Sequence, residues 1–190
     1  SRSSIFVAKQ RYEINFFQIL NKLQFLKNIL LLSDTHGFID NQILKYVKLA
    51  DEVWHAGDIG DIKVTDAITN IKPLRAVYGN IDNIEIRSEF PLDNRFMIDG
   101  VDIWITHIGG YPNRYNARIK EELQSNPPDI FISGHSHILK VMYDKKLKLL
   151  HLNSGAAGKH GIHQIRTMLR FEINNKNVQN LEIIELEKRT

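Results

Sequence analysis

The chain has 190 residues, 43% of them hydrophobic and 25% charged, which is the length and composition of one globular domain with a substantial core. Cysteine is absent, which excludes disulfides, zinc–thiolate sites and a catalytic thiol. The formal charge of +3 is mild and no basic run is longer than Lys145-Lys146, so nucleic acid is not a favoured partner. There is no apolar run of membrane-spanning length and no secretion signal, so we expect a cytoplasmic protein that does not bind membranes.

Residues 1–27 differ from the rest of the chain, because they contain no candidate chemistry. Ile19, Leu23 and Leu26 lie at helical spacing and predict a short amphipathic helix. Such a helix could pack on its own domain or mediate a homo-oligomer. We therefore expect a non-catalytic N-terminal extension followed by a single domain over 28–190.

From residue 28 onward the pattern alternates between strands and helices. The predicted strands of the first half are Ile29–Leu32, Glu52–His55 and Leu74–Tyr78. Asp40 is suited to capping a helix in which Ile43, Val47 and Ala50 share a face, and the apolar spacing over 64–71 predicts a second helix. Strands that alternate with helices in this way favour a parallel sheet with crossover helices.

The second half begins with a β-hairpin predicted over 95–106, with its turn at Asp99-Gly100. A helix follows, with Tyr115, Ile119 and Leu123 on one face, and a Pro-Pro pair ends it. The remaining predicted strands are Ile130–Ile132, Ile138–Tyr143, Leu147–Leu152, Met168–Ile173 and Val178–Glu187. We therefore predict an α/β fold, in which two sheets form a sandwich flanked by helices.

Candidate metal ligands follow directly after predicted strands. In chain order these groups are Ser33-Asp34-Thr35-His36-Gly37, Gly57-Asp58, Gly79-Asn80-Ile81-Asp82, His107 and Ser133-Gly134-His135-Ser136-His137. Because ligands of open α/β sheets bind beyond the carboxyl ends of the strands, we expect these side chains to meet in one crevice. The candidate ligands are carboxylate, imidazole and amide groups, without thiolate. Such ligands suit divalent ions such as Mn²⁺, Fe²⁺ or Zn²⁺ better than they suit a structural zinc site.

This ordered set of motifs resembles the calcineurin-like metallophosphoesterases, over the chain from Asn28 to the C-terminus. The compact size is similar to the small bacterial and archaeal phosphodiesterase branch of that family. The same branch resembles the retromer's metallophosphoesterase-like subunit, which works mainly as a scaffold. The resemblance implies a two-sheet metallophosphoesterase sandwich with its metal site at the carboxyl ends of the strands.

The resemblance also implies a dinuclear metal site. The ligands it assigns to one ion are Asp34, His36, Asp58 and His137, and those to the second are Asp58, Asn80, His107 and His135. Asp58 would bridge the two ions, and a hydroxide shared by the ions would attack phosphorus. Asp58 and Asn80 are thus the expected catalytic residues, with Asn80 also binding phosphoryl oxygens. Mn²⁺ is the favoured ion, and Fe²⁺, Zn²⁺, Ni²⁺ and Mg²⁺ are the alternatives.

The third motif departs from the family pattern, since many members have a histidine where this chain has Ile81. Isoleucine cannot protonate a leaving group, so the loss should impair poor alkoxide leaving groups most. We therefore expect a small phosphodiester as substrate, with a phosphomonoesterase and a non-catalytic scaffold as the alternatives; a nuclease on long DNA is a weaker option. Asp82 is expected to orient neighbouring ligands and not to bind metal itself.

Other polar and aromatic residues have less defined expectations. In the glycine-rich loop 153–163 and just after it, the candidates for contact with a substrate phosphate are Lys159, His160, His163 and Arg166, unless the loop is merely flexible. The residues expected to be structural are His55, His151, Trp54, Trp104 and Phe131.

Overall fold

The structure, a computed structural model, describes residues 26–161 and 163–188. The predicted N-terminal helix lies outside these residues, and the first strand, β1 (Lys27–Leu32), begins at the end of that segment. None of the helices in the described part of the chain is long and apolar enough to cross a membrane.

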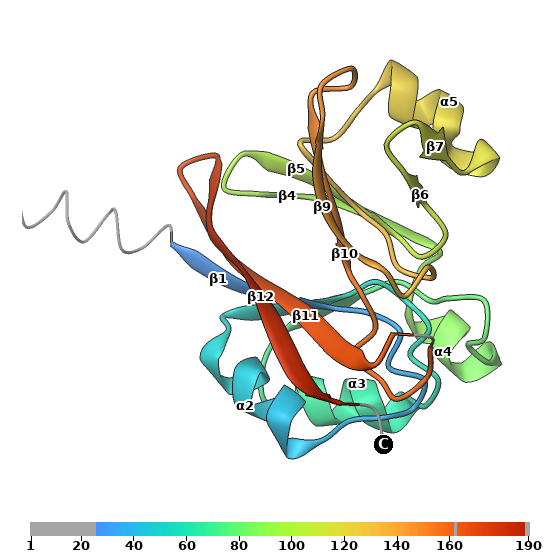
Figure 1. The fold of residues 1–190 in the computed structure, drawn as a ribbon, viewed down its shortest axis with the longest axis vertical. Helices are drawn as coiled ribbons and strands as arrows, with labels where there is room; N and C mark the ends of the chain where they lie inside the picture. Colours follow the sequence, from blue (N-terminus) through green and yellow to red (C-terminus); the bar gives the residue numbers. More distant parts are fainter. Residues whose placement is uncertain (1–25, 162, 189–190) are drawn as a thin grey trace, which may run out of the picture.

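Two five-stranded sheets form the sandwich, as Figure 1 shows. The first sheet has the order β12-β11-β1-β2-β3, with β2 at Glu52–His55, β3 at Leu74–Ala76, β11 at Ile165–Asn174 and β12 at Asn177–Lys188. Its strands β1, β2 and β3 are parallel, whereas β11 and β12 run antiparallel to their neighbours. The three parallel strands therefore end at one edge of the sheet.

The second sheet has the order β4-β5-β8-β10-β9. Its strands are β4 (Asp93–Ile98), β5 (Val101–Thr106), β8 (Ile130–Ile132), β9 (Leu139–Asp144) and β10 (Leu149–Ser154). The central strands β5, β8 and β10 are parallel, and the edge strands β4 and β9 are antiparallel to them. A small third sheet pairs β6 (Gly110–Tyr111) with β7 (Arg114–Tyr115). The predicted two-sheet α/β sandwich is confirmed.

Four helices flank the sheets in the described residues: α2 (Asn41–Leu49), α3 (Ile62–Thr69), α4 (Ile84–Glu89) and α5 (Ala117–Ser125). Each begins after an Asp or Asn whose side chain accepts a backbone N–H of the first turn; these N-caps are Asp40, Asp61, Asn83 and Asn116. An N-cap of this kind stabilises a helix by about 1 kcal/mol. Short polar side chains in the connecting loops thus fix where every helix starts.

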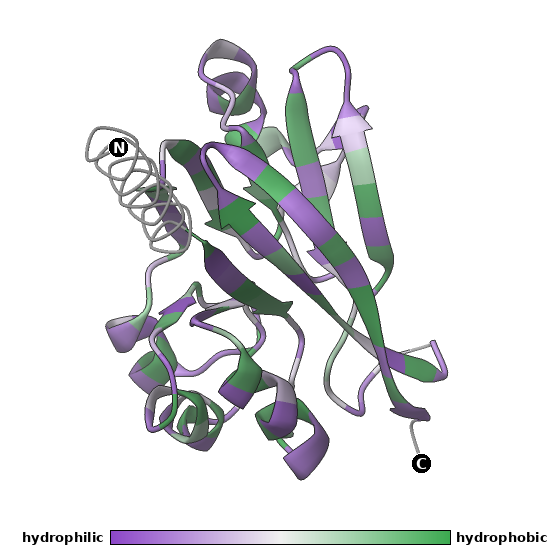
Figure 2. Ribbon diagram, turned by 90° about the vertical axis from the view of Figure 1, so that its left-hand side faces the viewer, coloured by the Kyte–Doolittle hydropathy of each residue, from purple (hydrophilic) through white to green (hydrophobic). Residues whose placement is uncertain are grey.

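The central strands β1 and β2 bury both of their faces, because their side chains alternate between two apolar layers. Ile29 and Leu31 of β1 point into the core between the sheets, where Trp54 packs edge-on against Phe171. Leu30 and Leu32 point the other way, into a second cluster beneath α2 and α3. A third cluster packs α5 on the outer face of the second sheet. Figure 2 shows the resulting alternation of hydrophobic and hydrophilic residues along the strands.

The main corrections that the structure makes to the sequence predictions are three. β3 ends at Ala76 and not at Tyr78, because its pairing with β2 stops at Ala76 and the chain continues into the loop that carries Asn80. Tyr115 lies in β7 and not on the face of α5; its hydroxyl donates to the Asp144 carboxylate at 2.7 Å, and the helix starts only after Asn116. Helix α4 was not predicted, since its six residues are too few to establish an apolar period.

We predict that Phe171→Ala lowers the free energy of unfolding by about 3–5 kcal/mol, because the side chain is 1% exposed and its removal leaves a cavity between the sheets. Leu49→Ala on α2 is the matched control: Leu49 is 62% exposed, so the change should stay within about 0.5 kcal/mol. Urea denaturation measures both values. Similar losses for the two variants would contradict this account of the core.

Candidate metal centre

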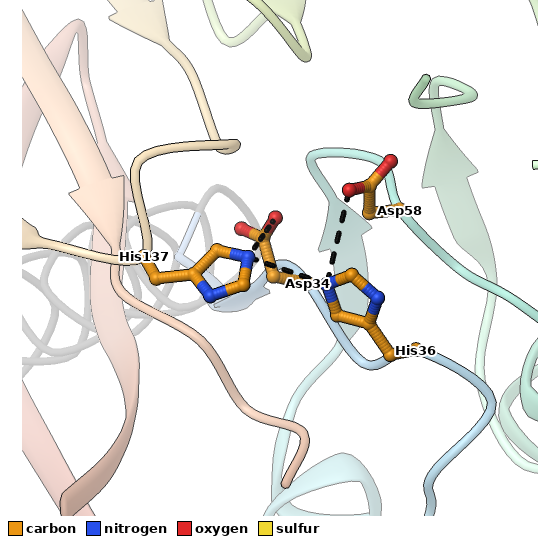
Figure 3. A group of neighbouring side chains, drawn as sticks. All are labelled: Asp34, His36, Asp58 and His137. Carbon is orange, nitrogen blue, oxygen red and sulfur yellow. Dashed lines mark hydrogen bonds and ion pairs between the residues drawn. The ribbon is translucent and has the colours of Figure 1, made fainter. Parts of the chain in front are cut away.

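The candidate ligands come together where the strands end. Asp34 and His36 follow β1, Asp58 follows β2, and His137 follows β8. One donor atom from each of these four residues lies within 4.8 Å of every other, and Figure 3 shows the two imidazoles directed at the two carboxylates. A group of four such donors drawn from three strand ends is a candidate site for one metal ion.

The separations within this first group suit a common ion. His36 Nε2 lies 3.2 Å from His137 Nε2 and 3.8 Å from Asp58 Oδ2, while His137 Nε2 lies 3.2 Å from Asp34 Oδ1. Ligand atoms about 2.1 Å from a tetrahedral ion would be roughly 3.4 Å apart. These three separations are therefore close to those of ligands around a common divalent ion.

A second group shares Asp58 with the first. Its ionisable members are Asp58, His107 and His135, with donor atoms within 4.8 Å of one another. His107 Nε2 lies 3.2 Å from Asp58 Oδ1 and 3.2 Å from Asn80 Oδ1. The two oxygens of the Asp58 carboxylate thus face different groups, Oδ2 toward His36 and Oδ1 toward His107. This is the arrangement that a bridging carboxylate requires.

The protonation chemistry of His107 also indicates a cation. Its Nδ1 donates to the carbonyl of Ala56 at 2.8 Å, which leaves Nε2 to face the carboxylate of Asp58. Burial lowers the pKa of His107, but the hydrogen bond to Asp58, the negative charges of Asp34 and Asp58 and the Ala56 carbonyl together outweigh burial, so the pKa is raised. The pair therefore favours a positive charge between Nε2 and Oδ1, and either a proton or a metal ion can supply it.

The backbone at these ligands adopts a conformation that non-glycine residues rarely take. Five of the six ionisable ligands have positive φ: Asp34 at 54°, His36 at 49°, Asp58 at 52°, His135 at 65° and His137 at 56°. Such conformations cost roughly 1–3 kcal/mol each and persist only where the surrounding structure enforces them. Other non-glycine residues with positive φ, such as Asp99 and Lys148, lie in turns away from the donor groups, whereas here the conformation recurs on side chains that converge.

Asp82 lies behind the ligands and holds three backbone amides. Its carboxylate accepts the N–H groups of Gly79 at 2.7 Å, Gly60 at 2.6 Å and Ile59 at 3.1 Å. It is 3% exposed and belongs to neither donor group. Asp82 thereby ties the loop after β3 to the loop that carries Asp58. Gly79 is needed at this junction, since a Cβ there would overlap the Asp58 carboxylate.

The loop after β10 is held against the ligand loop by its backbone. The N–H of Ala157 donates to the carbonyl of Ser33 at 2.9 Å, and that of Gly158 to Asp34 at 3.1 Å. This brings the ring of His160 to 5.1 Å from the ring of His36, so His160 borders the first donor group. The sequence left open whether this loop lies at the site or is merely flexible. The structure shows the loop anchored beside the first donor group.

Arg166 was expected as a candidate for contact with a substrate phosphate, and the structure instead gives it partners within the protein. Its side chain is buried, donating from Nε to the carbonyl of Ala157 at 2.9 Å and from the guanidinium to Asp40 at 2.8 Å. Arg166 thus positions the loop that carries His160.

Lys159 lies over the ring of Phe38, 5.0 Å from its centroid. His163 is exposed, and neither donor group contains it.

The two histidines expected to be structural are buried outside both donor groups. His55 bridges the loops: its Nδ1 accepts the N–H of Gly57 at 3.2 Å, and its Nε2 donates to the Thr35 hydroxyl at 2.9 Å. His151 Nε2 donates to the carbonyl of Gly110 at 3.0 Å. Burial lowers the pKa of each to about 4, so both are neutral at physiological pH.

Sequence reasoning missed the residues that support the ligands. Arg87 of the unpredicted helix α4 donates to the carbonyls of Asp82 at 2.7 Å and Asn80 at 3.0 Å, which holds the loop that carries Asn80. The Ser33 hydroxyl donates to the Asp34 carboxylate. The position of Ser33 next to Asp34 was a usable signal, whereas nothing in the sequence pairs Arg87 with its loop.

The family model of the calcineurin-like phosphoesterase superfamily domain matches residues 28–176. Among solved structures, a novel archaeal phosphodiesterase is 22% identical, with a TM-score of 0.64 and coverage of 84% of this chain and 99% of that one. Vps29 from Entamoeba histolytica, complexed with Zn²⁺, is 16% identical, with a TM-score of 0.61 and coverage of 83% and 98%. A predicted phosphoesterase from Streptococcus pneumoniae is 22% identical, with a TM-score of 0.57 and coverage of 85% and 98%.

At these identities the solved structures establish the fold that this chain shares with them, and not its activity. No curated protein sequence matches the chain.

We predict that Mn²⁺ added to chelator-treated protein raises its Tm, because an ion that binds only the folded state stabilises it by about 2.7 kcal/mol at 100 times Kd. Asp58→Asn should lose most of this shift, since the carboxylate faces both donor groups. Thermal denaturation over a Mn²⁺ series measures the effect. Asp66→Asn, at an exposed carboxylate of α3, is the control and should shift like the parent. Equal shifts in both variants would disprove the shared role of Asp58.

The buried histidines predict a pH dependence of stability in chelator-treated protein. The unfolded chain takes up a proton near pH 6.5, whereas folded His55 does so only near pH 4, so protonation between these values favours unfolding. The contribution, on the order of 3 kcal/mol, is complete above pH 6.5 and is lost as the pH falls toward 4. His151 contributes in the same direction, so His151→Gln should flatten the decline. Urea midpoints from pH 4 to 7 test this, and a flat parent profile would contradict it.

Proposed function

Because the chain belongs to the calcineurin-like phosphoesterase superfamily, we propose that it is a metal-dependent phosphodiesterase that hydrolyses a small phosphodiester. The observation that carries this proposal is the position of Asp58, whose two carboxylate oxygens face separate donor groups. A dinuclear site is the simplest use of such a residue. Mn²⁺ is the favoured ion, since the donors are carboxylate, imidazole and amide without thiolate.

In this proposal the first ion is held by Asp34, His36, Asp58 and His137, and the second by Asp58, Asn80, His107 and His135. When bound, the ions supply Lewis acidity, which lowers the pKa of a water toward neutrality and neutralises charge on the phosphoryl group. Asp58 is the residue that the two ions would share. The amide of Asn80 offers its oxygen to the second ion and its N–H₂ to a phosphoryl oxygen.

Ile81 supports a diester over a monoester as the substrate. Its backbone N–H donates to Asp58 Oδ1 at 3.1 Å, so the position is next to the site, but its side chain is 48% exposed and has no proton to give. An alkyl monoester leaves as a poor alkoxide that needs protonation. Diesters with an acidic leaving group do not, so they suit a site of this composition.

A non-catalytic scaffold of the same fold is the second candidate. Six ionisable candidate ligands converge, five of them in strained backbone conformations, and this speaks against a scaffold, because a scaffold does not require that their directions be maintained. A scaffold would retain metal without turnover. A panel of phosphodiesters and phosphomonoesters assayed with Mn²⁺ separates the three candidates, and absence of turnover on all of them would favour the scaffold.

We predict that the protein with Mn²⁺ hydrolyses bis(4-nitrophenyl) phosphate much faster than an alkyl phosphomonoester, and that Ile81→His narrows this difference. Positioned acid catalysis is worth ~10²–10⁴-fold, so the gain should appear in monoester turnover. The substitution keeps the backbone N–H that Asp58 accepts.

Ile84→His is the matched control, because Ile84 is 86% exposed at the start of α4. It adds the same imidazole three residues farther on and should leave the ratio of the two rates unchanged. An unchanged ratio in Ile81→His with normal metal content, or an equal change in the control, would refute this account of substrate choice.

A further inference from the structure

A cavity of about 320 Å³ adjoins the second donor group. Asn80 and His107 form one side of it, and the rest of its lining is Tyr78, Gly79, Arg87, Leu92, Ile108, Asn116 and Arg118. Tyr78, Leu92 and Ile108 make its wall largely apolar. Ligand pockets usually have about 300–1,000 Å³, so this one can take a single ring system attached to a phosphoryl group at the metal side.

Two guanidinium groups lie in the wall, and only one of them forms an ion pair with a carboxylate. Arg118 donates to both oxygens of Asp93 and to the Thr106 hydroxyl, so its charge is neutralised locally. Arg87 donates only to backbone carbonyls, and among the described residues no carboxylate lies within 4.0 Å of it. Arg87 therefore leaves a positive charge at the cavity, beside Asn80.

The Arg87 guanidinium also lies over an aromatic ring, 5.0 Å from the centroid of Tyr78. Its hydrogen bonds to the loop after β3 hold it in that place. A guanidinium fixed in this way, next to a tyrosine ring, presents a flat polarisable surface on which an aromatic ring can stack.

We propose that this cavity binds a flat aromatic ester group of the substrate, so that the preferred substrate is an aryl or nucleoside phosphodiester. The inference rests on the proposed function, since it takes the metal centre as the place where the phosphoryl group binds. The apolar wall accepts the ring, the uncompensated charge of Arg87 attracts the phosphodiester anion, and Asn80 and His107 join the two subsites.

Other ligands fit the cavity less well. A second phosphate group would need unpaired cationic donors, whereas Arg118 is occupied by Asp93 and the remaining wall is mostly apolar. An alkyl ester would gain from burial but not from the surface that Arg87 and Tyr78 provide. A long nucleic acid would extend beyond a cavity of this size.

Phosphonates test the proposal without turnover, because their C–P bond is not hydrolysed. Phenylphosphonate, cyclohexylphosphonate and methylphosphonate are titrated into the Mn²⁺-loaded protein by calorimetry. We expect phenylphosphonate to bind about tenfold more tightly than methylphosphonate, from burial of the ring, and more tightly than cyclohexylphosphonate, from stacking.

Leu92→Trp should abolish the preference for phenylphosphonate, because Leu92 lines the cavity and the larger side chain fills it. Leu92 is 39% exposed, so the fold should accept the change. Ile84→Trp places the same indole on the exposed side of α4 and should keep the preference of the parent.

Equal affinity for all three phosphonates in the parent, or an unchanged preference in Leu92→Trp, would overturn the proposal. The phenyl preference together with no turnover of any phosphodiester would sink the proposed function and leave the aromatic subsite standing. Turnover of phosphodiesters without a preference for phenylphosphonate would support the proposed function and overturn the aromatic subsite.

Discussion

The carboxylate of Asp58 is surrounded by groups that depend on its position. One oxygen faces His36 and the other faces His107, and the backbone N–H of Ile81 donates to the second oxygen. These groups come from the ends of β1, β3 and β5, so a displacement of Asp58 would disturb both donor groups together. Both sheets of the sandwich therefore have to be correctly placed for this one side chain to face both donor groups.

Strained backbone at the ligands requires compensation elsewhere, and the structure shows where it comes from. Asp82 accepts three amides from the two loops that carry Asp58 and Asn80. Arg166 holds the loop after β10, whose amides donate to the carbonyls of Ser33 and Asp34. The packed core beneath these loops supplies the remaining rigidity, because buried strands cannot shift without opening cavities.

The metal centre and the adjoining cavity would divide catalysis and selectivity between them. The donor groups are built from strand ends in the core of the fold, and their chemistry would act on any phosphoryl group. The cavity shares the segments after β3 and β5 with the second donor group, and α4, the loop before β4 and the start of α5 complete its wall. These elements lie at the surface, where substitutions alter shape with little cost to the core.

The sequence alone was sufficient for the two-sheet architecture, the N-cap of α2, the turn at Asp99-Gly100 and the motifs that contain the candidate ligands. These features are local: a period of two or 3.6 residues, a capping side chain and a glycine turn are each encoded within about ten residues. Because this signal is local, elements with too few residues to show a period, such as α4 and β7, could not be predicted from the sequence.

Only the tertiary structure decided which polar groups meet. His36 and His137 are 101 residues apart in sequence, yet their Nε2 atoms lie 3.2 Å apart. Arg166 pairs with Asp40 across 126 residues, a contact that no local sequence pattern indicates. Contacts of this kind depend on the order of strands in the sheets and on side-chain direction at each strand end. A single sequence records the residues but not the long-range packing that selects their partners.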